Sequence, residues 1–347
     1  MKRALIPLFG SALLVILGPS SVALADPPRG PCDIYADDGG PCVAAHSTVR
    51  RLLSTYTGPL YQVRKEGPSG GRTKDIGSTT SGFADAAAQD VFCSTYACTI
   101  SIIYDQSGKG NHLTKAPPGG VKTVGDNEAN AKALPITISG RNLYGEHNPI
   151  GVGYANHQAV GTAMNDEPET IYMITSGTYY NDACCFEYGN AMRNGRDNGD
   201  GTTEAIYFGK YSINCVGGGD GPWVLADFEY GMYAGDSCTY AANTPVTHKY
   251  ITAMVKGDKK SNSYPDGHWA IKVGNAQSGS LTKPFEGKRP RPSYNPMRKE
   301  GAIILGIDGQ NSNSGQGNFF EGVMTAHYSS DAADDAVQAN IVSVYGK

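Results

Sequence analysis

Two features that are common in nucleic-acid-binding and membrane proteins are missing from this sequence. It has no cluster of lysine and arginine, and its 29 basic residues are outnumbered by 33 acidic ones. A protein without a basic patch cannot neutralise a phosphate backbone, so we expect no nucleic-acid partner. The only long apolar run, from Leu5 to Leu17, is too short to span a bilayer, so we expect no membrane partner either.

The first 25 residues have the order of a secretory signal peptide. Lys2 and Arg3 precede the apolar run, and residues 23–25 (Ala-Leu-Ala) provide the small side chains of a cleavage site. We therefore expect a secreted, extracellular protein whose mature form is residues 26–347. Loss of Lys2 and Arg3 leaves 27 basic against 33 acidic residues, a net charge of −6.

Long helical patterns are also scarce, whereas residues typical of strands and turns are abundant. The chain contains 45 glycines, 20 prolines and 21 tyrosines, which favours many short strands joined by tight turns, as in a β-sandwich or barrel. The unbroken apolar run 301–307 predicts a fully buried strand. Ser330 is predicted to cap a last helix that runs from 331 to about 344. There is no internal repeat and no linker, so we expect one domain.

All eight cysteines follow the signal peptide, and their even number in an oxidising compartment predicts four disulfides. Short separations favour two of the pairs. Cys32 is expected to bond to Cys42, and Cys93 to Cys98.

The other four cysteines leave more than one pairing open. Cys184 and Cys185 are adjacent, so they could bond to each other in a strained ring or pair with distant partners, and the residues alone favour distant partners. Cys215 and Cys238 lie in the loops that flank a predicted strand. A bridge between them would tie those two loops together.

The strand between these loops is the most informative stretch. Residues 221–231 (GPWVLADFEYG) place two carboxylates in an otherwise apolar, aromatic run. Because side chains alternate along a strand, Asp227 and Glu229 should share one face, about 7 Å apart. Such a pair suits a sugar cleft, where one acid is a nucleophile and the other binds hydroxyls. An edge strand with two solvated acids fits the same pattern, and the local residues alone favour it.

Complete metal or cofactor motifs are missing. Residues 197–201 (Asp-Asn-Gly-Asp-Gly) resemble a calcium loop but lack its full oxygen spacing and its closing glutamate, so a solvated turn is expected. Asp105 and His112 could form a catalytic pair, but a turn held by side-chain to backbone hydrogen bonds explains them better. We therefore expect no metal and no organic cofactor.

Distinctive motifs are spread along nearly the whole chain. They are Pro31-Cys32-Asp33-Ile34-Tyr35, Ala44-Ala45-His46-Ser47-Thr48, Ile103-Tyr104-Asp105-Gln106-Ser107-Gly108, Asn111-His112-Leu113-Thr114, Ala116-Pro117-Pro118-Gly119-Gly120, Ala183-Cys184-Cys185-Phe186, Glu204-Ala205-Ile206-Tyr207, Gly221-Pro222-Trp223, Glu300-Gly301-Ala302-Ile303-Ile304-Leu305-Gly306-Ile307 and Glu321-Gly322-Val323-Met324-Thr325. With these motifs, the chain from Gly30 to Tyr345 resembles the catalytic domain of the glycoside hydrolase family 54 α-L-arabinofuranosidases, the arabinofuranosidase B type.

The resemblance implies an all-β fold, a concanavalin-like β-sandwich (jelly roll) with a few short helices. It also implies a retaining glycosidase that releases terminal α-L-arabinofuranosyl residues from arabinan- or arabinoxylan-type polysaccharides. The family's nucleophile falls on Glu229, and its neighbouring sugar-binding acid falls on Asp227. The family's vicinal disulfide, against which the sugar packs, falls on Cys184 and Cys185.

The same resemblance bears on the remaining disulfides and on domain organisation. Two further bridges of the family match the pairs of closely spaced cysteines, which leaves Cys215 and Cys238 as an additional pair. The C-terminal arabinose-binding domain of the family is expected to be absent, since the sequence stops at Lys347. We expect a monomer.

This sequence departs from the family at the residue that supplies the catalytic proton. The family's acid/base aspartate falls on Gln310, within residues 308–313 (Asp-Gly-Gln-Asn-Ser-Asn). A neutral amide cannot protonate a leaving oxygen, and loss of general acid catalysis costs about 10² to 10⁴ in rate. Asp308 could replace it, since positions two apart in an extended segment face the same way. That shift requires a rearranged loop, which Gly309 permits.

Other positions expected to contact the sugar also differ. Asn214 stands where the family has a tryptophan, and Tyr230-Gly231 replaces an Asn-Asn or Asn-Gly pair. Gly309 is expected to border the sugar as well. These departures leave two alternatives open. One is a catalytically impaired furanose-binding protein, and the other is a hydrolase for another furanose, such as D-arabinofuranose or galactofuranose.

Overall fold

The structure is a computed structural model that describes residue 1 and residues 28–67, 71–211, 216–237 and 239–347. The predicted signal peptide beyond residue 1 lies outside these ranges, as do Asn214, Cys215 and Cys238. The expectations about them therefore stay predictions. Within the described ranges, no helix has the length and apolar character needed to cross a membrane.

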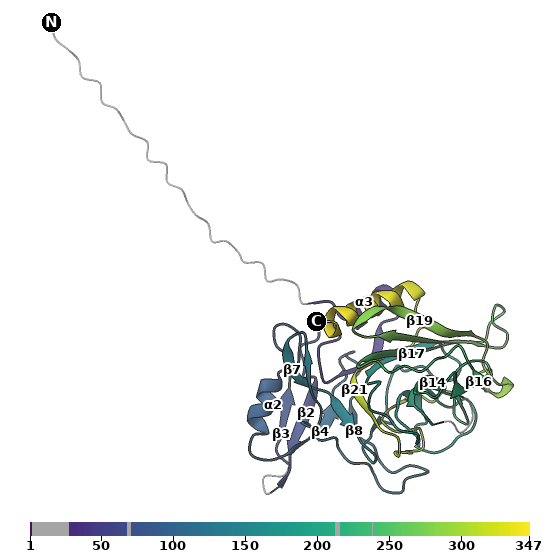
Figure 1. Ribbon diagram of the computed structural model, residues 1–347, viewed down its shortest axis with the longest axis horizontal. Helices are drawn as coiled ribbons and strands as arrows, with labels where there is room; N and C mark the ends of the chain where they lie inside the picture. Colours follow the sequence, from purple (N-terminus) through teal and green to yellow (C-terminus); the bar gives the residue numbers. More distant parts are fainter. Residues whose placement is uncertain (2–27, 68–70, 212–215, 238) are drawn as a thin grey trace.

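The predicted β-sandwich is confirmed, because antiparallel strands form two large sheets (Figure 1). The first sheet has the order β1-β21-β10-β17-β18-β19, and β8 also pairs with β21. Its strands are β1 (Cys42–Ser47), β8 (Glu146–Asn148), β10 (Glu169–Thr175), β17 (Ile251–Asp258), β18 (His268–Asn275), β19 (Ser278–Gly287) and β21 (Gly317–Thr325).

The second sheet has ten strands in the order β15-β14-β12-β11-β20-β9-β5-β4-β2-β3. They are β2 (Tyr61–Lys65), β3 (Thr73–Ile76), β4 (Cys98–Ile103), β5 (Leu113–Lys115), β9 (Tyr154–Asn156), β11 (Glu187–Ala191), β12 (Glu204–Gly209), β14 (Trp223–Asp227), β15 (Met232–Tyr233) and β20 (Ala302–Leu305). Among the residues that the structure describes, two short pairs complete the strands, β6 (Pro135–Ile138) with β7 (Arg141–Tyr144), and β13 (Val216–Gly217) with β16 (Thr239–Tyr240).

The two large sheets pack against each other around the main core. β12 and β14 of the second sheet contact β10, β17 and β18 of the first. Fully buried rings fill the space, among them Tyr172, Phe208 and Trp269. All four residues of β20 are buried, as the apolar run 301–307 predicted.

Three α-helices of the described ranges lie outside the sheets. They are α1 (Pro31–Asp37), α2 (Ala86–Phe92) and α3 (Asp331–Tyr345), and a 3₁₀ turn covers Pro292–Tyr294. Figure 1 shows α3 lying along β19, with which it is in contact. The predicted cap is confirmed, because the Ser330 hydroxyl accepts a hydrogen bond from the backbone N–H of Ala333 at 3.1 Å.

Two predicted disulfides are confirmed at the N-terminal side of the sandwich. Cys32 bonds to Cys42 and Cys93 to Cys98, with Cα–Cα distances of 5.4 and 5.8 Å. The first ties α1 to β1 and the second ties the end of α2 to β4. Both close short loops, which stabilises a fold by restricting its unfolded chain.

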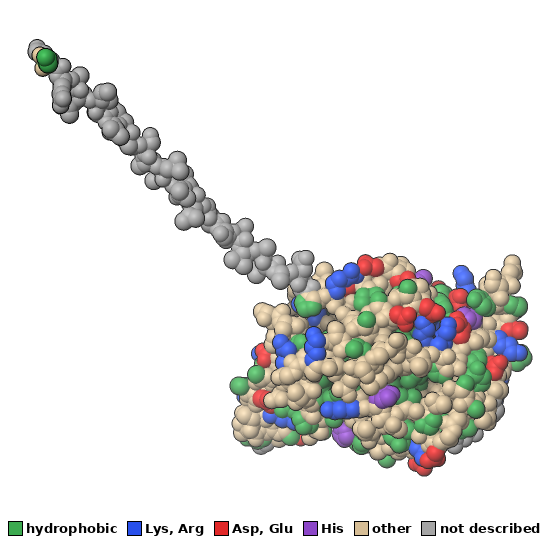
Figure 2. Space-filling view, turned by 45° about the horizontal axis from the view of Figure 1, so that its top comes forward, with side chains coloured by type: hydrophobic (Ala, Val, Ile, Leu, Met, Phe, Trp, Pro, Cys, Tyr) green, Lys and Arg blue, Asp and Glu red, His purple; other side chains and the backbone are tan. Residues whose placement is uncertain are grey.

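Charged groups are dispersed on one face of the surface, whereas a group of charges between the sheets is paired. On the face in Figure 2, lysine and arginine side chains are scattered among acidic and uncharged ones. Between the sheets, the Lys299 ammonium lies 3.1 Å from a carboxylate oxygen of Glu169 on β10 and 2.8 Å from one of Glu204 on β12. Burial disfavours the charged form, but Arg289 and Lys299 outweigh it and lower the pKa of Glu204 to about 2. These ion pairs fix β12 against the opposite sheet.

Glu146 on β8 is a buried acid without such a partner. Its side chain is fully buried, and neither carboxyl oxygen meets a donor among the described residues. Burial raises its pKa from 4.5 to about 8. The contribution of Glu146 to stability is therefore complete below pH 4.5 and is lost as the pH rises to about 8, by at most about 1.4 kcal/mol per pH unit.

We expect Glu146→Gln to remove this loss, because an amide stays neutral at every pH. The difference in melting temperature between the variant and the wild type should grow in the variant's favour from about pH 5 to pH 8. Glu66→Gln, at an exposed glutamate, is the control and should leave the wild-type profile unchanged. Parallel curves for wild type and Glu146→Gln would contradict the assignment.

Candidate functional site

A cavity of about 230 Å³ opens where the end of β14, the segment before β11 and the loop after β20 meet. It brings together most of the residues singled out in the sequence. The lining consists of Cys184, Cys185, Tyr211, Asp227, Glu229, Tyr230, Gly231, Met232, Asp308, Gln310 and Ser312. Tyr211, Met232 and Ser312 were not predicted. Gly309 is not among the lining residues, because its backbone packs against Met192 so closely that a Cβ would lie 2.6 Å from Cε.

The acids of the central stretch reach the cavity by a different geometry from the one predicted. β14 ends at Asp227, and Glu229 and Tyr230 both adopt left-handed backbone conformations, with φ of 57° and 61°. The expected strand through Glu229 is therefore wrong for its last two residues. The Asp227 carboxylate stabilises the turn by accepting the backbone N–H of Glu229 at 2.9 Å. Left-handed non-glycine residues are strained by about 1 to 3 kcal/mol each, a cost that is commonly found at functional sites.

Two donors hold the Glu229 carboxylate. Gln310 Nε2 donates to Oε1 at 2.9 Å, and Thr203 Oγ1 donates to Oε2 at 3.1 Å. Glu229 is only 5% exposed. Burial, with the nearby charges of Asp227 and Asp308, raises its pKa to about 8. Sequence reasoning missed Thr203, which precedes β12 and meets Glu229 only because β12 and β14 are neighbours.

Asp308 lies in a tight turn rather than in an extended segment. Its Oδ1 accepts the backbone N–H groups of Gln310 at 2.9 Å and Ser312 at 2.6 Å. Oδ2 points toward the sulfur of Cys184 at 3.9 Å. We expected Asp308 and Gln310 to face the same way because they lie two positions apart in an extended loop. The extended loop is wrong, although both residues line the cavity. Burial raises the pKa of Asp308 despite the two backbone donors.

The sulfurs of Cys184 and Cys185 are bonded to each other. The vicinal disulfide implied by the family resemblance is confirmed, and the distant pairing favoured by the residues alone is wrong. Backbone hydrogen bonds join this segment to the loop after β20, from Cys185 N–H to the Ser312 carbonyl at 3.3 Å and from Ser314 N–H to the Cys184 carbonyl at 3.0 Å. The disulfide and Asp308 are thus held together as one wall of the cavity.

The other polar clusters of the sequence have structural roles. Asp105 accepts the backbone N–H groups of Ala45 and Ser107, both at 2.9 Å, and the ring of His112 accepts the N–H of Asp105. The turn interpretation is therefore confirmed. Asp197 accepts a hydrogen bond from the hydroxyl of Tyr230, which is 53% exposed and lies at the rim of the cavity.

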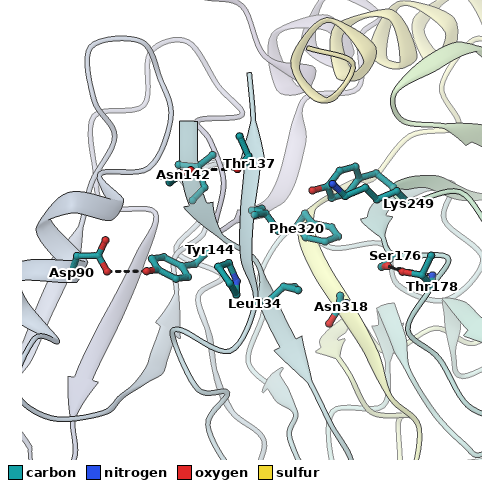
Figure 3. A pocket seen from close by; sticks show the side chains of 14 residues that line it. Asp90, Leu134, Thr137, Asn142, Tyr144, Ser176, Thr178, Lys249, Asn318 and Phe320 are labelled. Atoms are coloured by element: carbon teal, nitrogen blue, oxygen red, sulfur yellow. Dashed lines mark hydrogen bonds between the residues drawn. The ribbon is translucent and has the colours of Figure 1, made fainter. Parts of the chain in front are cut away.

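A larger cavity, of about 570 Å³, lies elsewhere, between the β6–β7 hairpin, the segment before β17, and strand β21 (Figure 3). Its one acid, Asp90, accepts a hydrogen bond from Tyr144, and a second bond joins Ser176 to Thr178. It shares no residue with the carboxylate-lined cavity. Paired acids, rather than size, identify the smaller cavity as the candidate active site.

Known proteins resemble this chain over most of its length. The family model for the catalytic domain of α-L-arabinofuranosidase B matches residues 31–346. An arabinofuranosidase/B-xylosidase of Trichoderma koningii is 53% identical over 320 residues, which cover 90% of this chain and 62% of that protein. The α-L-arabinofuranosidase B of Aspergillus oryzae is 50% identical over 339 residues, covering 96% and 64%. The chain thus spans less than two thirds of the length of these relatives.

Solved structures give the same result. An arabinofuranosidase complexed with arabinofuranosyl-α-1,2-xylobiose superposes with a TM-score of 0.86 at 48% identity, covering 90% of this chain and 65% of the other. A family 54 α-L-arabinofuranosidase soaked with a cyclic sulfate inhibitor matches with the same values.

Proposed function

Because the chain belongs to the α-L-arabinofuranosidase B catalytic family, we propose that it is a secreted, retaining glycoside hydrolase that removes terminal α-L-arabinofuranosyl residues from arabinan- or arabinoxylan-type polysaccharides. The observation that carries the proposal is the position of Glu229. Its carboxylate is held by two donors in a cavity bordered by a second acid and by the vicinal disulfide. No metal or organic cofactor takes part in this chemistry.

Glu229 acts as the nucleophile. The hydrogen bonds from Gln310 and Thr203 favour the ionised form that attack requires, and they act against the burial and the neighbouring acids that raise its pKa to about 8. Its carboxylate attacks the anomeric carbon and forms a glycosyl ester, while the bond to the leaving oxygen breaks. The surrounding carboxylates stabilise the positive charge that develops on the sugar in the transition state.

Asp308 supplies the proton. Its Oδ1 is occupied by two backbone donors, whereas Oδ2 points toward the sulfur of Cys184, so Oδ2 is the oxygen that carries the hydrogen. The raised pKa keeps this proton bound at higher pH than for an exposed aspartate. Asp308 protonates the leaving oxygen in the first step. In the second it takes a proton from the water that cleaves the ester, which restores both acids and the original anomeric configuration.

The remaining lining residues bind the sugar. Asp227 accepts hydrogen bonds from furanose hydroxyls, and the disulfide of Cys184 and Cys185 provides an apolar wall for the ring. Tyr230 lies at the rim, where the next unit of the polysaccharide leaves the cavity.

One observation favours a second function, a furanose-binding protein without turnover. The position that matches the family's acid/base residue holds Gln310, whose amide is engaged with Glu229. If Asp308 does not reach the leaving oxygen, the cavity binds the sugar but releases nothing.

The test is to incubate the protein with 4-nitrophenyl α-L-arabinofuranoside and to follow the first product by NMR. We expect arabinose release, with the α anomer formed first, because double displacement retains configuration. Release of the β anomer first would exclude Glu229 as a nucleophile. Binding of arabinose without any release would establish the second function. Preferential cleavage of another aryl furanoside would show that the protein releases a furanose other than arabinose.

A further inference from the structure

Glu187, the first residue of β11, has no role in the mechanism above and yet lies directly behind the sugar wall. It is fully buried, and its carboxylate and the sulfurs of Cys184 and Cys185 all lie within 4.8 Å of one another. Neither of its oxygens meets a donor among the described residues. A buried acid without a donor loses several kcal/mol if it is ionised, so its presence beside the sugar wall calls for an explanation.

The strand register places Glu187 on the same face of the sheet as Asp227. Glu187 on β11 pairs with Tyr207 on β12, and Tyr207 pairs with Leu225 on β14. Asp227 follows Leu225 by two residues and therefore projects from the same face of the sheet. Hydrogen bonding between the two carboxyl groups raises the pKa of Glu187 and acts to lower that of Asp227. Two carboxylates offer only acceptors, so a bond between them requires a proton on one of them.

The count of donors at each acid decides which one holds this proton. Glu229 receives two side-chain donors, and Asp308 receives two backbone N–H groups. Asp227 receives the backbone N–H of Glu229. Glu187 receives none. A negative charge is therefore stabilised least on Glu187.

Electrostatics act in the same direction. Several titratable groups face Glu187. Asp227 and Glu229 do so from the end of β14, Asp308 from the loop after β20, and Tyr207 from β12. Burial, followed by the charges of the three acids, holds the pKa of Glu187 well above its usual range.

We propose that Glu187 is a positioning residue that stays protonated and donates its hydrogen to Asp227, so that Asp227 remains an oriented, charged acceptor for a furanose hydroxyl. The role of Asp227 in this inference rests on the proposed function, whereas the protonation of Glu187 does not. An acid of this kind acts as a neutral hydrogen-bond donor, a use that burial makes available to carboxyl groups.

The protonation state is tested by infrared spectroscopy in the absence of substrate. At about pH 9, where Glu146 is largely ionised, the wild type should show the carbonyl stretch of a protonated carboxyl group that is missing from Glu187→Gln. The same band should persist in Glu146→Gln. Absence of the band from the wild type would overturn the inference, whether or not the protein releases arabinose.

The positioning role is tested by two substitutions of similar size. Glu187→Gln keeps a neutral donor to Asp227, so its KM for an aryl arabinofuranoside should stay within about threefold of the wild type. Glu187→Met fills the space without a donor, and its KM should rise roughly tenfold or more with a smaller change in kcat. Equal effects of the two substitutions would overturn the role. If Glu187→Met does not fold, a large rise in KM for Glu187→Gln alone would also overturn it.

If the protein shows the infrared band but releases no arabinose, the proposed function fails, whereas the protonation of Glu187 stands. The effect of Glu187 on Asp227 would be read from arabinose affinity, which should fall for Glu187→Met and not for Glu187→Gln.

Discussion

Replacement of Glu229 by glutamine is expected to reduce arabinose release from an aryl arabinofuranoside by a factor on the order of 10⁴ to 10⁶, the range found when a nucleophile is removed from a catalytic unit. An amide cannot form the ester intermediate, so both steps of the reaction are lost. The fold should survive, because the glutamine is isosteric and its carbonyl oxygen still accepts the hydrogen bond of Thr203. Kinetics on purified protein with an unchanged melting temperature check this result.

Two additional measurements make the interpretation specific. Added azide should restore part of the activity of the truncated variant Glu229→Ala, because a small external anion can occupy the space of the lost carboxylate and attack the same carbon. The exposed Glu66→Gln serves as the control and should retain full activity. A Glu229→Gln protein with nearly wild-type rates would show that another residue attacks the sugar, or that the chemistry takes place outside this cavity.

Replacement of Asp308 by asparagine is expected to separate substrates by their leaving group. Release from arabinoxylan oligosaccharides, whose leaving alcohol needs a proton, should fall by about 10² to 10⁴. Release from 4-nitrophenyl arabinofuranoside should change far less, since nitrophenolate leaves without protonation. The asparagine keeps an oxygen for the backbone N–H groups of Gln310 and Ser312, which preserves the turn. The ratio of kcat/KM between the two substrates is the quantity to compare.

Gln310→Asp provides the matched reciprocal change. The Gln310 amide already lies 2.9 Å from Glu229, so an acid at this position is next to the nucleophile. In the Asp308→Asn background it should restore part of the activity on poor leaving groups. Equal losses on both substrates for Asp308→Asn would contradict its role as the acid. A gain of about 10² or more for Gln310→Asp alone would show that the natural chain lacks an acid, as the second function requires.

Several features of the site could be predicted because they are encoded locally or in motifs. The cap at Ser330 depends on one hydroxyl and the helix that follows it, and the pairs Cys32–Cys42 and Cys93–Cys98 depend on short separations. The family motifs indicated the acids of the 221–231 stretch and the vicinal disulfide. Local reasoning on the adjacent cysteines gave the wrong pairing, because the backbone bonds that hold their segment come from a loop about 130 residues later in the chain.

Sequence alone thus determined that this protein is a β-sandwich with a pair of acids at Asp227 and Glu229, since strand composition, turn residues and motifs are properties of short segments. Only the tertiary structure decided how those acids are held. Thr203 and Glu187 reach them because β14, β12 and β11 are neighbours in the sheet, an order that no local pattern specifies. The backbone turn at Glu229, rather than strand alternation, aims its carboxylate into the cavity, because a left-handed conformation is stable there only with contacts from the rest of the fold.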